Sequence, residues 1–207
     1  MPIFQKADKM ILFVHIPKAA GSSIEQLFTE SGWSMNLFKP CSSPYEPAEQ
    51  HLTYEKLGEL LEDIDDITSF TVVRNPFRRL VSEWRWQLST MRTTDVDFDH
   101  FVRRVQVSLL HSRTYWDNHW RPQTEFLSDA IDRVMKIENI DEDFSNFARE
   151  HDLDLAGPIP RRNRSRRRFL RSSPKLACST ETMDRILEIY ETDFDVLGYP
   201  KEMPALA

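Results

Sequence analysis

The chain alternates short continuous apolar runs with segments in which apolar residues recur at helical spacing. The first apolar run, residues 10–16, predicts a buried parallel strand. It ends at Pro17, and a loop of small residues leads to Ile24, Leu27 and Phe28, which share one face of a helix. This order predicts a strand, a tight loop and a helix in succession.

The same order recurs twice further along the chain. Residues 69–73 predict a second strand, and Pro76 suits the first turn of a helix that carries Leu80, Val81 and Trp84. Residues 131–137 predict a third strand. Periodic apolar residues predict further helices over four segments, namely 53–64, 97–108, 144–148 and 183–194.

Strands that alternate with helices predict an α/β fold with a central, mostly parallel sheet flanked by helices. Such sheets bind ligands at the carboxyl ends of their strands. The length of 207 residues suits one domain, so we expect a single domain over residues 1–207. The N-terminal apolar run is too short for a signal peptide, and no run approaches the ~20 residues of a membrane helix. We therefore expect a cytoplasmic protein without a transmembrane segment, of unspecified oligomeric state.

Charge and cysteine content narrow the classes of function. The net charge of −6 argues against general nucleic-acid binding, but residues 161–171 hold seven arginines and no acid, which leaves −13 for the rest. This contrast indicates a local anion site. Cys41 and Cys178 lack metal-ligand spacing, and they are either free thiols in a reducing compartment or a disulfide pair. No cluster of His, Cys and Asp predicts a metal.

The loop over residues 18–23 (KAAGSS) has the chemistry of a phosphate site. Small side chains let the backbone approach an anion closely, two serine hydroxyls add donors, and Lys18 adds a positive charge. An ordinary strand-to-helix turn that happens to contain a lysine is the alternative. The spacing differs from the GxxxxGK[ST] loop of nucleoside triphosphatases, because Lys18 precedes Gly21 by three residues.

A second candidate anion site follows the second strand. Arg74 emerges at the carboxyl end of that strand, and Ser82 lies two turns along the next helix. A guanidinium and a hydroxyl together can grip a terminal phosphate. In the alternative interpretation, Arg74 makes a salt bridge at the strand end and Ser82 is a neutral helix residue.

Together the two loops resemble a known pair of motifs. Residues 15–23 (HIPKAAGSS) are similar to the 5′-phosphosulfate loop of sulfotransferases that use 3′-phosphoadenosine 5′-phosphosulfate (PAPS), and residues 73–82 (VRNPFRRLVS) resemble their 3′-phosphate motif. The match is nearest to the carbohydrate branch, which includes the heparan 2-O-sulfotransferases and small bacterial enzymes. The resemblance implies a P-loop-like sulfotransferase fold and sulfuryl transfer from PAPS to a hydroxyl of an acceptor, a carbohydrate by analogy with that branch.

The resemblance also assigns roles to residues of this chain. Lys18 would stabilise charge on the bridging oxygen of the donor as its S–O bond breaks. Arg74 and Ser82 would bind the 3′-phosphate, which the product adenosine 3′,5′-bisphosphate retains. The remaining donor contacts would come from the first loop and the arginine-rich segment, through Ala19, Gly21, Ser22, Ser23 and Arg166. Ala19 stands where some relatives have threonine, which puts one side-chain contact in doubt.

The acceptor hydroxyl needs a general base, and His51 resembles the histidine base of the 2-O-sulfotransferase branch. We expect His51 to lie in an exposed loop. We also expect the activity of the protein to fall below about pH 6.5, because an ordinary imidazole becomes protonated there. A surface histidine near a helix start is the alternative. Weaker candidates are His111, His119, Glu25 and Glu138, whereas His15 is expected to be a packed core residue.

Other features leave alternatives open. Most arginines of residues 161–171 are either solvated or available to an anionic acceptor. A group of aromatic residues either stacks on sugars or belongs to the core, namely Tyr115, Trp116, Trp120, Trp84 and Trp86. Two other functions compete with sulfuryl transfer: a P-loop kinase, and a non-catalytic module that binds nucleotides or polyanions. The position of Lys18 and the Arg74–Ser82 pair argue against the kinase.

Overall fold

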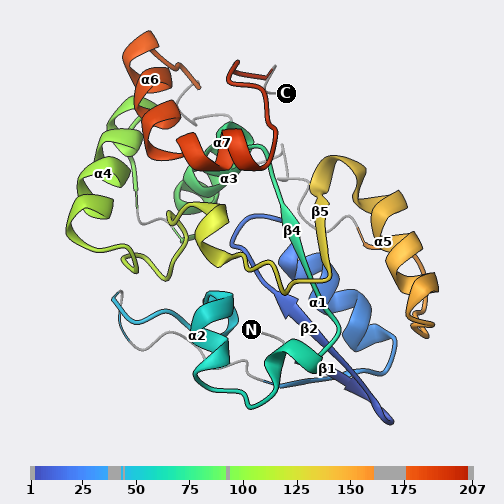
Figure 1. Cartoon of the computed structure of the whole chain (residues 1–207). Helices are drawn as coiled ribbons and strands as arrows, with labels where there is room; N and C mark the ends of the chain where they lie inside the picture. Colours follow the sequence, from blue (N-terminus) through green and yellow to red (C-terminus); the bar gives the residue numbers. More distant parts are fainter. Residues whose placement is uncertain (1–2, 37–42, 44, 92–93, 161–175, 205–207) are drawn as a thin grey trace.

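The computed structural model describes residues 3–36, 43, 45–91, 94–160 and 176–204. Its centre is a five-stranded sheet in the order β3-β1-β2-β4-β5 (Figure 1). The strands are β1 (Ile3–Lys6), β2 (Lys9–Val14), β3 (Ser34–Asn36), β4 (Ser69–Val73) and β5 (Arg133–Lys136). The three strands that the apolar runs predict are all present.

The sheet is mixed, so the prediction of a mostly parallel sheet is wrong for one side of it. β2, β4 and β5 run parallel, whereas β1 pairs antiparallel with both β2 and β3. β1 and β3 are short, and part of each is exposed. They lack the continuous apolar run of a strand buried on both faces, which is why the sequence pattern does not reveal them.

Helices cover both faces of the sheet (Figure 1). α1 (Gly21–Glu30) and α5 (Ile140–Glu150) pack on one face through a cluster rich in phenylalanine, which includes Phe28, Phe70 and Phe147. On the other face lie α2 (Tyr54–Gly58) and α3 (Pro76–Trp86), and the larger apolar cluster continues into α4 (Phe98–His111), α6 (Thr180–Ile189) and α7 (Glu191–Val196). The larger cluster thus joins the sheet to the helices that follow it.

Local signals place the starts of α2, α3 and α4 correctly. The Thr53 hydroxyl accepts a hydrogen bond from the Lys56 N–H at 3.3 Å, and Pro76 occupies the first turn of α3 after the cap Asn75. Two predicted helices are interrupted. α2 ends at Gly58 and leaves Leu60 60% exposed, and the closing helix is divided at Tyr190 into α6 and α7.

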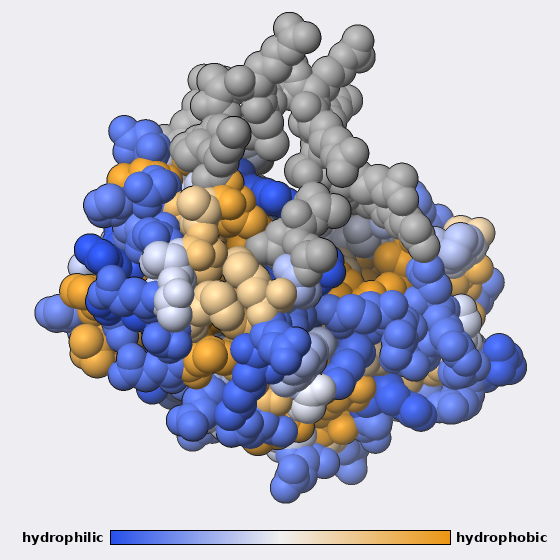
Figure 2. Space-filling view, turned by 90° about the horizontal axis from the view of Figure 1, so that it is seen from above, coloured by the Kyte–Doolittle hydropathy of each residue, from blue (hydrophilic) through white to orange (hydrophobic). Residues whose placement is uncertain are grey.

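The outer surface is largely polar. Figure 2 shows a face on which hydrophilic residues predominate and apolar residues form separate patches, in keeping with a chain of which 29% is charged. Within the described part of the chain, no helix is long and apolar enough to cross a membrane.

Candidate active site

Two strand-to-helix loops meet at one edge of the sheet. β2 and β4 are parallel neighbours with Val14 opposite Thr71, so the loops that follow them leave the sheet side by side. One guanidinium nitrogen of Arg74, Nη1, donates a hydrogen bond to the carbonyl of Lys18 at 3.1 Å. Lys18 and Arg74, predicted separately from two motifs, therefore lie together.

The first loop has an unusual backbone. Lys18 and Ala20 adopt left-handed conformations with φ of 67° and 72°, which cost energy for residues other than glycine. Ala20 caps α1 without a side-chain hydrogen bond, and the first N–H groups of any helix lack intrahelical partners. The backbone N–H groups of Gly21 and Ser22 are therefore directed out of the N-terminal end of α1, as an anion site requires.

The side chains of this loop differ in exposure. Ser22 is exposed, Ser23 is 8% exposed, and Ala19 is buried at 1% within the larger apolar cluster. Because its methyl group belongs to the core, Ala19 can reach a ligand only through its backbone.

Gly21 is required by a close approach rather than by its backbone angles. A Cβ atom at Gly21 would lie 1.9 Å from His15 Nε2. His15 is 6% exposed and lies 2.8 Å from Glu25 Oε1, so the prediction that it is a packed core residue is confirmed. The glycine of the motif thus makes room for a buried imidazole directly beneath the loop.

The backbone of Arg74 is held by Gln123, which sequence reasoning did not identify. The Arg74 N–H donates to Gln123 Oε1 at 2.8 Å, and Gln123 Nε2 donates to the Arg74 carbonyl at 2.8 Å. Burial lowers the pKa of the Arg74 guanidinium, which Glu138 opposes. Arg74 Nε is buried and has no partner among the described residues, so this donor is available to an anion.

Ser82 lies on a half-buried stripe of α3 that also contains Arg78, Arg85 and Trp86. After burial and Glu138, the charges of Arg78 and Arg85 also act on the pKa of Arg74. Ser82 therefore lies between two arginines that are close enough to Arg74 to influence it electrostatically.

The Lys18 ammonium lies 4.4 Å from the centre of the Trp86 ring, in a cation–π contact. Burial lowers the pKa of Lys18, the carboxylate of Glu83 raises it, and Arg74 lowers it again. Lys18 is thus a partly buried cation between two groups of opposite charge.

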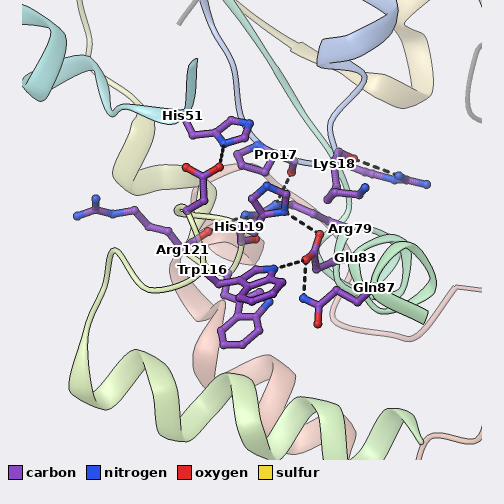
Figure 3. A network of polar contacts seen from close by, with 12 residues as sticks. Pro17, Lys18, His51, Arg79, Glu83, Gln87, Trp116, His119 and Arg121 are labelled. Atoms are coloured by element: carbon purple, nitrogen blue, oxygen red, sulfur yellow. Dashed lines mark hydrogen bonds and ion pairs between the residues drawn. The ribbon is translucent and has the colours of Figure 1, made fainter. Parts of the chain in front are cut away.

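Glu83 is the centre of a polar network that the sequence did not indicate (Figure 3). Its carboxylate is 1% exposed and accepts hydrogen bonds from Gln87 Nε2 at 2.7 Å and Trp116 Nε1 at 3.1 Å, and it pairs with His119 Nδ1 at 2.8 Å. Burial alone would raise its pKa, but His119, Lys18 and Gln87 lower it to about 2. Glu83 is therefore ionised at neutral pH.

His51 lies beside this network, but it is buried rather than in an exposed loop. It is 5% exposed, and its Nδ1 lies 2.7 Å from Asp117 Oδ2. Its ring makes edge-on contacts with His15 and His119 at centroid distances of 4.9 and 5.0 Å. Burial lowers the pKa of His51 to about 3, against the pull of Asp117, so the buried imidazole is expected to stay neutral near pH 6.5.

The other proposed bases have different surroundings. Glu138 accepts hydrogen bonds from the Asn75 N–H at 3.3 Å and the Tyr199 hydroxyl at 3.0 Å. His111 ends α4, with its Nδ1 2.8 Å from the Val107 carbonyl. Of these weaker candidates, His119 contacts His51. It also contacts Trp86 and Glu83, which lie beside Lys18.

A left-handed turn positions His51 and His119 relative to each other. Trp116, Asp117 and Asn118 have φ values of 59°, 56° and 59°, although none is glycine. Asp117 accepts the Ala48 N–H at 2.6 Å and pairs with His51, and Asn118 Nδ2 donates to the His51 carbonyl at 2.8 Å. Three consecutive left-handed residues cost of order 1–3 kcal/mol each, and such strain is concentrated at functional sites.

Arg79 connects this turn to the first loop. It is 2% exposed, and its guanidinium donates to the carbonyls of Pro17 at 3.1 Å, His119 at 2.9 Å and Arg121 at 2.8 Å. Arg79 and Glu83 are charged residues one turn apart among the apolar residues of α3. That placement is the sequence signal that could have identified both.

One group within the described chain has residue types that can bind a metal: His51, Asp117 and His119, with candidate ligand atoms within 4.8 Å of one another. Both Asp117 oxygens already accept hydrogen bonds, and His119 Nδ1 is paired with Glu83. The structure thus uses these groups as imidazole–carboxylate pairs.

The aromatic residues divide into two sets. Trp84 and Trp120 are 2% and 1% exposed, so they belong to the core and are not available for stacking on a sugar. Trp86, Tyr115 and Trp116 are half-buried. The proposed donor ligand Arg166 and the other arginines of residues 161–171 lie outside the described residues.

Comparison with known proteins gives one match. A family model described as the sulfotransferase family covers residues 1–200 of this chain. No curated protein and no solved structure gives a significant match.

Proposed function

Since the chain belongs to the sulfotransferase family, we propose that it transfers a sulfuryl group from PAPS to a hydroxyl group of a carbohydrate. We include in this proposal that residues 1–207 form one domain. The proposal also includes phosphate binding by β2, its loop and α1 in the manner of P-loop proteins, although Lys18 stands at a different position from the lysine of the P-loop.

The observation that carries the proposal is the junction of the two loops. Lys18 and Arg74 are joined by a hydrogen bond of 3.1 Å, and Arg74 Nε is a buried donor with no partner among the described residues. The N-terminal end of α1, where Gly21 lets the loop pack on buried His15, adjoins them. These features support two anion-binding positions side by side, and PAPS carries two separate phosphate groups.

Each proposed residue has a distinct task. When bound, the donor supplies an activated sulfuryl group. Gly21, Ser22 and Ser23 would hold its 5′-phosphate, with a backbone contribution from Ala19, and Arg74 and Ser82 would hold its 3′-phosphate. Arg166 is proposed as a further donor ligand. Lys18 would place positive charge beside the oxygen that leaves sulfur with the bonding electrons.

His51 is proposed to receive the proton of the acceptor hydroxyl as the new O–S bond forms. Its Nδ1 is paired with Asp117, whose pKa is lowered by the hydrogen bond to His51 although burial opposes this. Nε2 is then the nitrogen without a proton, and it can act as the base. The half-buried aromatic residues Tyr115 and Trp116 support a sugar as the acceptor, whereas the Trp86 ring already contacts Lys18 and His119.

Nucleotide binding tests the donor assignment. We expect adenosine 3′,5′-bisphosphate to bind about 10- to 150-fold more tightly than AMP, because a charge-assisted contact contributes roughly 1.5–3 kcal/mol. Calorimetry with the bisphosphate, AMP and ATP measures this difference. Arg74→Ala should abolish the preference, whereas Arg133→Ala, which removes a surface ion pair with Glu150, should not. Equal affinities for the bisphosphate and AMP, or tighter binding of ATP, would contradict the proposal.

Turnover tests the two catalytic assignments. With labelled PAPS and a panel of glycans, we expect Lys18→Ala and His51→Ala each to lower kcat by ~10²-fold or more. Both variants should bind adenosine 3′,5′-bisphosphate and show wild-type circular dichroism. A His51→Ala variant with normal turnover would transfer the role of base to His119, Glu25 or Glu138.

A further inference from the structure

Two residues within one turn of α3, Glu83 and Trp86, lie around the Lys18 ammonium. The Lys18 ammonium is 4.4 Å from the centre of the Trp86 ring. His119 is also stacked on Trp86, with ring centroids 5.2 Å apart and an interplanar angle of 22°. One indole therefore holds both the cation of the first loop and an imidazole of the left-handed turn.

Glu83 lies three residues before Trp86 on the same helix, and so nearly one turn away. It is held by Gln87, Trp116 and His119, and Figure 3 shows its carboxylate between His119 and Lys18. Burying a carboxylate is costly unless it is hydrogen-bonded and faces positive charge. Three donors around Glu83 satisfy the first condition, and Lys18 contributes to the second.

Among the described residues, Lys18 makes no ion pair with a carboxylate, and its ammonium contacts the ring of Trp86. A direct ion pair would fix and neutralise the ammonium, and an incoming anion would have to break it. A cation–π contact holds the group in place and leaves its N–H donors available. A carboxylate at longer range still favours the charged form of the lysine.

We propose that Trp86 and Glu83 are positioning residues for Lys18, an inference that rests on the proposed function. Trp86 sets the place of the ammonium, and Glu83 keeps the ammonium protonated inside a partly buried site. Among the described residues, the charged groups that act on the Lys18 ammonium are Glu83 on α3, which is negative, and Arg74 after β4, which is positive. His119 in the left-handed turn stacks on the same Trp86 ring.

The alternative is a purely structural role, in which Glu83 only anchors His119, Trp116 and Gln87. Both roles predict that Glu83→Gln lowers stability. Only the positioning role predicts a change in the titration of Lys18, because only that role depends on the negative charge. Gln is nearly isosteric with Glu, so this variant preserves the shape of the site, although it keeps only one of the two acceptor oxygens that serve His119 on one side and Gln87 and Trp116 on the other.

The first experiment measures the pKa of Lys18 directly, by NMR of the lysine side chains of the whole protein without any nucleotide. We expect Glu83→Gln to lower the pKa of Lys18 by about one unit. Glu125→Gln is the control for loss of a paired carboxylate, since Glu125 is paired with Arg121 and Arg113 but is more exposed than Glu83, and it should leave Lys18 unchanged. An unchanged Lys18 titration in folded Glu83→Gln overturns the role of Glu83.

The second experiment measures kcat against pH with PAPS and the panel of glycan acceptors. Lys18 acts when protonated, so activity is lost as the pH rises through its pKa. Glu83→Gln should shift this alkaline limb to lower pH by the amount that NMR finds, whereas a structural role would lower kcat at all pH values without moving the limb.

Replacement of Trp86 tests whether its ring positions the Lys18 ammonium. We expect Trp86→Leu to lower kcat about 3- to 30-fold while the affinity for adenosine 3′,5′-bisphosphate stays within about twofold. Trp86→Phe keeps a weaker ring and should lose less, which preserves the test if the leucine variant does not fold. Trp33→Phe, at a buried tryptophan on the opposite face of the sheet, is the control. Wild-type kcat in both Trp86 variants overturns the role of Trp86.

These outcomes can be separated from a failure of the proposed function. If the wild-type protein does not prefer the bisphosphate and transfers no sulfate, the proposed function fails. The Lys18 titration is read without donor or acceptor, and it decides the role of Glu83 in either case.

Discussion

Gly21 shows how a single missing side chain shapes the candidate site. His15 Nε2 occupies the volume that a Cβ atom at this position would fill, at a distance of 1.9 Å. His15 is buried below the loop and lies 2.8 Å from Glu25, so it cannot move away without disturbing that pair. The backbone path of the loop therefore depends on a contact beneath the loop.

We expect Gly21→Ala to destabilise the protein by about 1–3 kcal/mol, because the methyl group overpacks a rigid site. Helix propensity alone predicts the opposite sign, since alanine is favoured over glycine in a helix. Urea unfolding measures the change. Gly157→Ala is the matched control, because no atom lies within 4 Å of the added Cβ. If Gly21→Ala is as stable as the control, the steric account of the motif glycine is wrong.

At the scale of elements, α7 supports a loop that is distant in sequence. Asp193 on α7 accepts hydrogen bonds from the Gln123 backbone at 2.9 Å and from its side chain at 3.2 Å. Gln123 in turn holds the N–H and the carbonyl of Arg74, each at 2.8 Å. The C-terminal helix thus reaches the proposed 3′-phosphate site through two buried side chains.

We expect Gln123→Leu to weaken binding of adenosine 3′,5′-bisphosphate by about tenfold or more. The substitution leaves two buried backbone groups of Arg74 without partners, at a cost of about 1–3 kcal/mol each, so the Arg74 loop moves or the protein loses stability. Calorimetry and urea unfolding measure the two effects. Gln106→Leu on α4 removes more exposed hydrogen bonds with Glu188 and Arg185 and serves as the control. Unchanged nucleotide affinity in folded Gln123→Leu would show that Gln123 does not position Arg74.

At the scale of the whole molecule, buried ionisable groups couple the site to stability. Burial lowers the pKa of folded His51 to about 3 from a reference value of 6.5. Between these values the unfolded chain binds one proton more, so this contribution to stability is lost as the pH falls below about 6.5. Glu83, with a folded pKa of about 2 against a reference of 4.5, adds a loss of the same sign below about pH 4.5.

We therefore expect the free energy of unfolding to fall between pH 6 and pH 5, and His51→Gln to reduce that slope by about 1 kcal/mol per pH unit. Urea unfolding over this range measures both slopes. His100→Gln is the control, because His100 is exposed and pairs with Asp97 at the surface. The same slope in His51→Gln as in the wild-type protein would mean that folded His51 titrates near its ordinary value.

What the sequence determined by itself is local and periodic. Continuous apolar runs predicted β2 and β4, because strands buried on both faces require apolar residues at most positions. β5 was predicted from residues 131–137, although it contains Arg133 and Lys136 and only its Met135 is buried. Two motifs at strand-to-helix junctions predicted Lys18 and Arg74 as ligands of two phosphate groups, and the structure places them together because parallel strands end at one edge of a sheet. The family followed from the same motifs, and the match over residues 1–200 confirms it.

Only the tertiary structure decided which polar side chains are buried and what they face. Glu83, Arg79 and Gln123 belong to no motif in the sequence. Apart from Gln87, which is one turn from Glu83, their partners are 33 to 70 residues away, because packing rather than local propensity brings them together. The burial of His51, and with it the direction of its pKa, also depends on the turn that carries Asp117 and Asn118. Periodicity describes which face of an element is apolar, whereas long-range contacts determine how each polar group is solvated, and this solvation sets the chemistry of the site.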